Sequence, residues 1–418
     1  MKLYIDPGTG SMLFTILIGL IGALGFAAKA FWSKLKFRLT GGKRSETEKD
    51  TIPFVIFSDD KRYWPVFEPV CRELSSRGFD TVYMTASPDD PALDSALEHF
   101  KAEFIGEGNR AFAKLNYLDA TLLLATTPGL DVYQWKRSKK VKYYVHMLHC
   151  ANDSTLYRMF ALDFFDAVLL SGKYQAEDIR DLEKLRDESE KELVLIGIPY
   201  MDEMVKRLES EGDSESDAKN ESETTVLIAP SWGPSAIFRK FGGSIIKVLL
   251  DSGYHIIVRP HPQSFKSETE MIDSLMKEFP DSDRLEWNRD NDNFNVLCRS
   301  DILISDFSGI VFDFSLVHDK PVIYADTTFD RSPYDSWWLE DKPIWTFETL
   351  PKLGEQITEE SLSSLPEMIE RCLSDKKYAE GRKRAREETW AYPGEGAVRA
   401  ADYIISKYRE LTERKEDN

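Results

Sequence analysis

The sequence predicts an α/β protein with two Rossmann-like domains that face a cleft, preceded by an N-terminal membrane helix. Along most of the 418 residues, short apolar runs alternate with helical patterns. Runs that are apolar throughout are typical of parallel strands covered on both faces. A polar, acidic stretch divides this alternation into two blocks, as a linker between domains does. An uncharged apolar run precedes both blocks.

The N-terminal run, Met12–Ala28, has 17 residues without a charge, the short end of what spans a bilayer. Aromatic and basic residues without an acid follow over Phe31–Arg44. This flank predicts an anchor over residues 1–45, a cell-membrane location and a cytoplasmic catalytic body. A cleaved signal peptide fits less well, because Asp6 opposes the single early base, Lys2. A monotopic helix stays open.

The first block, residues 50–205, predicts an N-terminal Rossmann-like domain. A helical pattern covers Tyr63–Arg77 and ends near Gly78. The expected strands are Ile52–Phe57, Thr81–Thr85, Ala120–Ala125, Lys142–Leu148 and Ala167–Leu170. Leu208–Glu223 then holds seven acids and one lysine, so residues 206–224 are expected to form a solvated loop or linker.

The second block, residues 225–405, predicts a C-terminal Rossmann-like domain. Helices are expected over Ile237–Leu250 and Thr269–Phe279. The expected strands are Thr225–Ala229, His255–Val258, Ile302–Ile304 and Val322–Tyr324. Residues 406–418 read as a charged tail that frays.

Composition excludes several classes of protein. Seventy-two acidic residues against 54 basic ones give a net charge of −18, which argues against nucleic acid as a partner. The four cysteines are far apart and form no CxxC pair, which excludes a zinc ribbon and a dense disulfide framework and fits a reducing compartment.

Ligands of open α/β sheets bind at the carboxyl ends of strands, so polar residues at strand ends are the candidate site. His149 follows one strand, and a histidine there can act as general base near neutral pH. His146 precedes it by three residues and reads more readily as a core residue. The pair has no third ligand nearby, so we expect no metal.

Two strand ends in the second block carry polar turns. Ser231 and Trp232 lie in a Ser/Gly turn that leads into a helix, where backbone N–H groups can hold a phosphate. Arg259 and His261 belong to the run Arg-Pro-His-Pro, in which two prolines restrict the backbone around the histidine. Arg259 adds a permanent cation suited to phosphate.

A third strand end in this block, Ser305–Gly309, leads directly into a helix. Ser305 and Asp306 are natural helix caps. The helix start presents N–H donors to a diphosphate, with the hydroxyl of Ser308 beside them and Gly309 allowing close approach. A purely structural cap is the alternative.

Taken in order, these segments resemble the CDP-glycerol glycerophosphotransferase family of teichoic-acid polymerases and primases. The resemblance spans residues 142–400. Its specific motifs are RPHP at Arg259–Pro262, SDFSGIVFDF at Ser305–Phe314 and KPVIYAD at Lys320–Asp326. Looser likenesses are VLIAPSW at Val226–Trp232 and GEGAVRAADYI at Gly394–Ile404. Where the family usually has Trp-His-Gly-Thr, this chain has Leu-His-Cys-Ala around His149.

The resemblance implies a GT-B architecture and a membrane-associated enzyme that uses CDP-glycerol or a related CDP-alditol such as CDP-ribitol. It implies that residues 50–205 form the acceptor-side domain and residues 225–405 the domain that binds the nucleotide donor. It implies that His149 and His261 matter for catalysis. It also implies that the donor diphosphate meets Ser305, Asp306, Ser308 and Gly309. Asp306 would orient a donor hydroxyl or only cap the helix.

Together these inferences predict transfer of glycerol phosphate from CDP-glycerol to a hydroxyl of a lipid-linked or cell-surface glycan acceptor, with release of CMP. His149 is the first choice for the base and His261 the second. No cofactor is expected. Two alternatives stay open: a GT-B glycosyltransferase or epimerase acting on a nucleotide sugar, and a non-catalytic membrane-anchored binding module. The acceptor and the oligomeric state stay undetermined.

Overall fold

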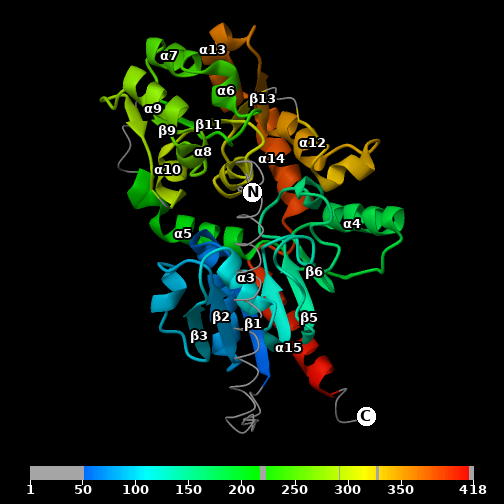
Figure 1. Cartoon of the computed structure of the whole chain (residues 1–418). Coiled ribbons are helices and arrows are strands. Elements are labelled where there is room, and N and C mark those ends of the chain that lie inside the picture. Colours follow the sequence, from blue (N-terminus) through cyan, green and yellow to red (C-terminus); the bar gives the residue numbers. More distant parts are fainter. Residues whose placement is uncertain (1–50, 217–222, 291, 326–328, 414–418) are drawn as a thin grey trace, which may run out of the picture. The chain divides into compact units, whose positions relative to one another are not determined.

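Two parallel β-sheets, each covered by helices on both faces, form the frame of the protein (Figure 1). The computed structural model describes residues 51–216, 223–290, 292–325 and 329–413. The predicted anchor, Met12–Ala28, lies outside these ranges. Within them, no helix combines the length and the apolar character needed to cross a membrane.

The N-terminal sheet has seven parallel strands in the order β3-β2-β1-β4-β5-β6-β7. The strands are β1 (Ile52–Ser58), β2 (Thr81–Thr85), β3 (Phe100–Phe104), β4 (Asp119–Ala125), β5 (Lys140–Met147), β6 (Ala167–Leu170) and β7 (Glu192–Leu195). Successive residues of β1 enter opposite cores: Phe54 and Ile56 pack on one face, Val55 and Phe57 on the other. Burial on both faces is why these strands read as continuous apolar runs.

Helices cover both faces of this sheet. On one face lie α2 (Trp64–Ser76) and α15 (Gly396–Glu413), and on the other α3 (Asn109–Leu115) and α4 (Lys173–Arg186). The short 3₁₀ turn η1 (Lys61–Tyr63) connects β1 to α2.

The C-terminal sheet repeats this arrangement with six parallel strands in the order β10-β9-β8-β11-β12-β13. The strands are β8 (Thr225–Ile228), β9 (His255–Val258), β10 (Leu285–Trp287), β11 (Ile302–Ser305), β12 (Val322–Ala325) and β13 (Gly354–Ile357). This is the order of a doubly wound Rossmann fold, so the predicted α/β class with two Rossmann-like halves is confirmed.

The helices of this half also lie on both faces of their sheet. One face carries α6 (Ile237–Phe241), α7 (Ser244–Asp251), α9 (Thr269–Glu278) and α13 (Leu365–Ser374). The other carries α5 (Pro199–Ser216), α10 (Phe294–Arg299), α11 (Ile310–Phe312), the π-helical turn η4 (Asp313–Val317), α12 (Trp345–Leu353) and α14 (Lys376–Thr389). The short helix α8 (Ser264–Ser267) precedes α9.

The acidic stretch is helical where the sequence predicted a loop. Helix α5 continues to Ser216, and so includes the first eleven residues of the predicted linker 206–224. Met201 and Met204 at its start are buried in the core of the C-terminal half. Packing of this first part, together with the Arg207–Glu211 ion pair one turn later, extends the helix into polar sequence.

The last helix returns to the N-terminal half. Ala400, Ala401 and Ile404 of α15 are buried in the same core as β1 and β4, although their sequence follows the C-terminal sheet. Figure 1 shows this helix in red, beside the strands of the lower sheet. It continues to Glu413, so residues 406–413 are helical where a frayed tail was predicted. The Lys407–Glu192 ion pair, at 2.7 Å, joins this extension to β7.

The helix predicted over Ile237–Leu250 is two helices, α6 and α7. The break falls at Gly242 and Gly243, and Gly242 has a φ of +54°, in the left-handed region. A Cβ on Gly243 would stand 2.4 Å from the ring of Phe279, so the close packing here requires glycine.

Candidate active site

In each sheet the first three strands along the chain are added in one direction, and the fourth strand lies on the other side of the first. The strand order therefore reverses between the first and the fourth strand. These points lie between β1 and β4 in the N-terminal half and between β8 and β11 in the C-terminal half. Crevices at such points are where doubly wound sheets bind ligands. Ser231 and Trp232 follow β8, Ser305–Gly309 end β11 and follow it, and η1 follows β1.

The loops at the carboxyl ends of the two sheets meet. Asp153, four residues after His149, accepts the backbone N–H groups of Trp345 at 2.9 Å and Thr346 at 2.8 Å, which begin α12 of the other half. Asn152 lies beside Gly309, because a Cβ on this glycine would stand 3.5 Å from Asn152 Nδ2. The β5 loop with His149 is therefore tied to the β11 loop and to α12.

Several buried polar atoms at these loops have no hydrogen-bond partner among the described residues. They are Thr126 Oγ1, His149 Nδ1 and Asn152 Oδ1. Folded proteins leave few such atoms unsatisfied, so their presence in the loops after β4 and β5 is typical of a ligand site.

His149 lies directly after β5, with its ring edge-on to that of Tyr63 at 5.1 Å between centroids. Burial lowers the pKa of His149 to about 4, so the ring is neutral at pH 7. His146 lies within β5, fully buried between Tyr157 and Phe165. Burial lowers the pKa of His146 to about 3, and its position within the strand is that of a core residue.

His261 lies in the loop after β9. Its Nδ1 accepts the backbone N–H of Gln263 at 3.1 Å, so the proton of the neutral ring is on Nε2. Burial, assisted by the positive charge of Arg62, lowers the pKa of His261 to about 4. The half-exposed ring of Trp232 lies beside it, with 6.4 Å between the centroids.

Arg259 points to a neighbouring loop. Its guanidinium donates to Oδ1 of Asn288, which follows β10. Burial lowers the pKa of Arg259, against the opposing charges of Asp290 and Asp292.

Asp306 and Ser305 use their side chains to hold the site's backbone. Both carboxylate oxygens of Asp306 accept the N–H of Ser231 at 3.0 Å, and one also accepts the N–H of Ile237 at 3.2 Å. The hydroxyl of Ser305 donates to the carbonyl of Ala229 at 2.6 Å. Burial raises the pKa of Asp306. These contacts shape the β8 turn, while the partly buried Ser308 and Gly309 lie at the start of α11.

Two features of the site were missed by sequence reasoning. Asp313 lies in the π-helical turn η4, and burial raises its pKa to about 7, against a hydrogen bond from Asn293 that lowers it. The sequence could have indicated Asp313, because it lies inside the motif Ser305–Phe314. The other feature is the turn η1, with Arg62 and Tyr63, which the polar residues at the end of β1 could have indicated.

Within the described ranges, no group of three or more histidine, cysteine or acidic side chains is arranged to hold a metal.

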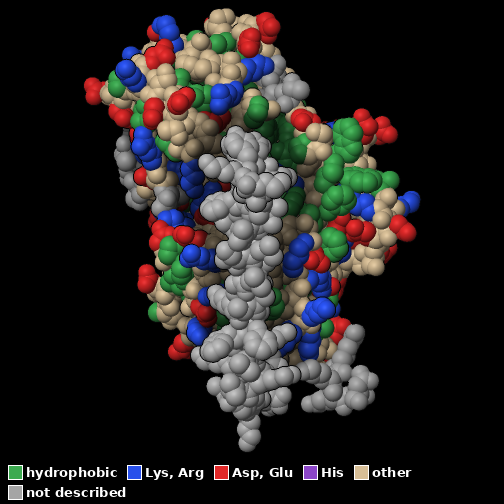
Figure 2. All heavy atoms as spheres, viewed as in Figure 1, with side chains coloured by type: hydrophobic (Ala, Val, Ile, Leu, Met, Phe, Trp, Pro, Cys, Tyr) green, Lys and Arg blue, Asp and Glu red, His purple; other side chains and the backbone are tan. Residues whose placement is uncertain are grey.

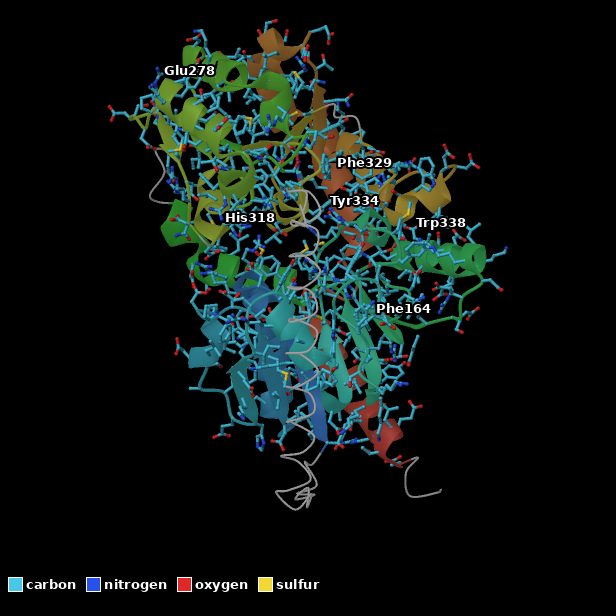
Figure 3. The ribbon with its side chains drawn as sticks, in the orientation of Figure 1. Phe164, Glu278, His318, Phe329, Tyr334 and Trp338 are labelled. Atoms are coloured by element: carbon cyan, nitrogen blue, oxygen red, sulfur yellow. The ribbon has the colours of Figure 1, made fainter. Side chains whose placement is uncertain are left out.

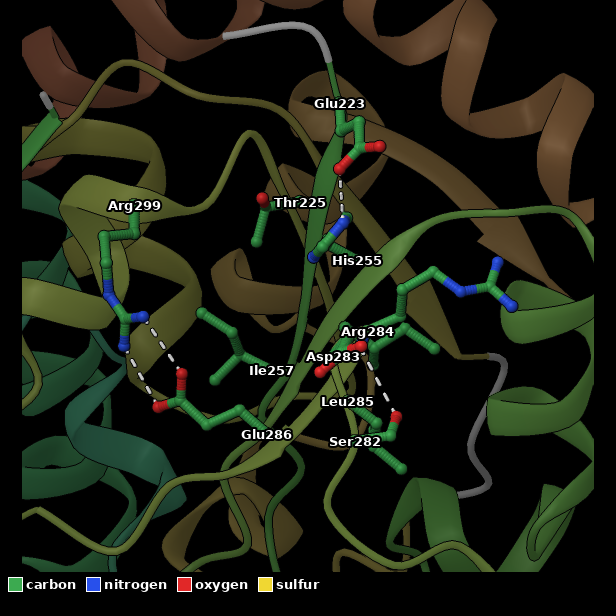
Figure 4. A pocket seen from close by; sticks show the side chains of 11 residues that line it. Glu223, Thr225, His255, Ile257, Ser282, Asp283, Arg284, Leu285, Glu286 and Arg299 are labelled. Carbon is green, nitrogen blue, oxygen red and sulfur yellow. Dashed lines mark hydrogen bonds and ion pairs between the residues drawn. The ribbon is translucent and has the colours of Figure 1, made fainter. Parts of the chain in front are cut away.

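A pocket of about 300 Å³ lies at the opposite, amino-terminal edge of the C-terminal sheet (Figure 4). Several of its charged side chains pair with one another: Glu223 with His255, and Arg299 with Glu286. It contains none of the candidate site residues.

Comparisons with known proteins agree with this geometry. The profile of the family described as CDP-Glycerol:Poly(glycerophosphate) glycerophosphotransferase matches residues 150–405. No curated protein matches the chain. Among solved structures, the fold is similar to a CDPG-soaked variant of the wall teichoic acid polymerase TagF, with a TM-score of 0.59 and 14% identity over 88% of this chain and 92% of that one.

Two further structures share the fold. One is the UDP-GlcNAc 2-epimerase of Methanocaldococcus jannaschii in complex with UDP-GlcNAc and UDP, with a TM-score of 0.55 and 11% identity over 84% of this chain and 99% of that one. The other is a glycosyltransferase from Rickettsia africae, with a TM-score of 0.50 and 12% identity over 87% of this chain and 99% of that one.

Proposed function

Since this chain belongs to the CDP-glycerol:poly(glycerophosphate) glycerophosphotransferase family, we propose that it transfers glycerol phosphate from CDP-glycerol to a hydroxyl of a lipid-linked or cell-surface glycan acceptor and releases CMP. The observation that carries the proposal is the placement of two neutral histidines at strand ends of opposite halves, His149 after β5 and His261 after β9. One serves the acceptor and the other the donor.

In the proposed reaction the acceptor oxygen attacks the phosphorus that carries glycerol. The bond from that phosphorus to the bridging oxygen breaks, and CMP leaves with the electron pair. His149 takes the proton of the acceptor hydroxyl, since its neutral ring has a lone pair. Bound diphosphate raises the pKa of His149, because nearby negative charge favours the protonated ring.

The donor side supplies hydrogen bonds to the phosphates. His261 donates through Nε2–H, since its Nδ1 already accepts the Gln263 N–H. The backbone N–H of Gly309 and the hydroxyl of Ser308 add donors, whereas the Ser308 N–H donates to Asp306, which also holds the facing β8 turn in place. Donors positioned before the reaction stabilise charge that develops during phosphoryl transfer.

Exposed aromatic side chains support an acceptor that carries an apolar part. Four of them, Phe160, Phe164, Trp337 and Trp338, are 37 to 50% exposed. Figure 2 shows hydrophobic side chains gathered on one side of the molecule, and Figure 3 places Phe164, Trp338, Tyr334 and Phe329 along that side. Trp and Phe at a surface are typical of contact with a lipid interface. The predicted anchor at Met12–Ala28 would keep the enzyme at the same membrane.

The test is product identity with the detergent-solubilised full chain, a lipid-linked glycosyl acceptor, and CDP-glycerol, CDP-ribitol or a UDP-sugar as donor. We expect CMP from CDP-glycerol and no nucleoside diphosphate. Release of UDP, or epimerisation of the UDP-sugar, would support the nucleotide-sugar enzyme that the epimerase-like and glycosyltransferase-like fold leaves as the second candidate. Binding of CDP-glycerol without turnover under any acceptor would support the binding module.

A further inference from the structure

The turn η1 interacts with both candidate histidines. The ring of Tyr63 packs edge-on against His149 in its own half. Arg62, the preceding residue, acts electrostatically on His261 of the other half. Lys266 of α8, the short helix that follows the His261 loop, acts electrostatically on Asp60 of the β1 loop. The charge of Arg62 therefore reaches the β9 loop of the other half, while the next residue, Tyr63, contacts His149.

Arg62 is held in one orientation by its neighbour. Asp60 accepts hydrogen bonds from Nε at 2.9 Å and from Nη2 at 3.2 Å of the guanidinium. The same carboxylate accepts the backbone N–H of Arg62 at 3.0 Å, which caps the turn. Nevertheless, the side chain of Arg62 is 53% exposed. A guanidinium has five N–H donors, and Asp60 engages two of them, so others remain for a ligand.

Lys61, the cation next to Arg62 in the sequence, is not available for the same role. Lys61 is paired with Asp89, a residue of the loop after β2. The positive charge that the N-terminal half directs at His261 is thus that of Arg62.

We propose that Arg62 is a substrate-contacting residue that binds the phosphoryl group carrying glycerol, between the acceptor at His149 and the donor diphosphate at His261. The proposal rests on the proposed function. It adds a cation from the acceptor half to a donor site otherwise built from the C-terminal half. In phosphoryl transfer, negative charge spreads over the oxygens of the migrating group, and a pre-oriented guanidinium stabilises that charge.

The test is calorimetric binding of CMP, CDP and CDP-glycerol to the full chain, with wild type, Arg62→Ala, Arg62→Lys and the control Arg72→Ala. Arg72 is a half-exposed arginine of α2, paired with Glu203. For Arg62→Ala we expect affinity for CDP and CDP-glycerol to fall about 10- to 100-fold and affinity for CMP to change less than about 3-fold. Arg62→Lys keeps the positive charge but loses the planar set of N–H donors of the guanidinium. Its affinity for CDP and CDP-glycerol should lie between those of wild type and Arg62→Ala.

A second measurement needs no substrate. The charge of Arg62 lowers the pKa of His261, so Arg62→Ala should raise it in an NMR titration, and Arg72→Ala should not. Unchanged CDP-glycerol binding in a folded Arg62→Ala protein, or an equal loss for CMP, would overturn the Arg62 assignment and leave the proposed function intact. A wild type that binds none of the three nucleotides would overturn both.

Discussion

The backbone N–H of Gln263 donates a 3.1 Å hydrogen bond to Nδ1 of His261. This contact determines the tautomer of the neutral ring, because a ring nitrogen that accepts a hydrogen bond cannot also carry the proton. His261 therefore offers an N–H at Nε2, which suits a phosphate oxygen and not a hydroxyl proton. The same contact makes His149, and not His261, the better base.

Replacement of His261 should distinguish a donor from a base. We expect His261→Ala to lower the rate of CMP release about 10²- to 10³-fold, as loss of a positioned donor does. His261→Gln should recover part of that loss, because its amide presents an N–H near the place of Nε2. His255→Ala is the matched control, since His255 begins the same strand at its other end. Equal inactivity of the Ala and Gln variants would argue for a base.

The pH dependence should follow the buried histidines. Burial lowers the pKa of His149 to about 4, so this ring stays neutral from pH 8 down to about pH 5. We expect kcat/KM to lack an acid limb near pH 6.5 and to fall only below about pH 5. His149→Ala should abolish transfer and preserve CDP-glycerol binding, with the exposed His99→Ala as control. An acid limb near pH 6.5 in the wild-type profile, or full transfer activity in His149→Ala, would contradict this.

Asp313 should limit stability at neutral pH. Burial raises its pKa to about 7 in the folded protein, against an ordinary value of 3.8. The folded state thus binds a proton that the unfolded state has lost, and stability decreases as pH rises from about 4 to 7. Asp313→Asn should therefore raise the free energy of unfolding at pH 8 by about 1 to 3 kcal/mol and have little effect at pH 4. Denaturant unfolding at both pH values checks this. An equal change in the free energy of unfolding at pH 4 and pH 8 would contradict a raised pKa of Asp313.

Asp306 should matter through the β8 turn. In Asp306→Asn, an amide N–H₂ would face the N–H groups of Ser231 and Ile237, which now donate to carboxylate oxygens. We expect a loss of about 1 to 3 kcal/mol in unfolding free energy and weaker CDP-glycerol binding. Asp273→Asn, at an exposed position of α9, is the control. Full stability with lost binding would instead indicate direct contact between Asp306 and the donor.

The strands were predictable because they are buried on both faces. Thr81–Thr85, Ala167–Leu170 and His255–Val258 have the bounds that their apolar runs indicated. The edge strand β3 was missed, because its sequence Phe-Lys-Ala-Glu-Phe is half polar and its residues are only partly buried or exposed. The strand β13, Gly354–Ile357, was missed for a similar reason, having one strongly apolar residue.

The candidate site was predictable as a set of strand ends and not as a set of contacts. Strand ends with Ser, His or Arg are visible in the sequence, and parallel strands bring their carboxyl ends together. Which side chains then turn toward the ligand depends on partners far away in the chain. Arg259 is held by Asn288 and Asp306 by the β8 turn, whereas the charge of Arg62, from a loop far earlier in the chain, acts on His261.

The sequence by itself determined the α/β class, the two blocks of parallel strands and the motifs that carry the family resemblance, because burial patterns and turn residues are local properties. Only the tertiary structure decided that α15 joins the N-terminal core, that the polar stretch extends α5, and that Tyr63 packs against His149. Those features depend on packing between segments distant in the chain, and such contacts leave no periodic signal in either partner alone.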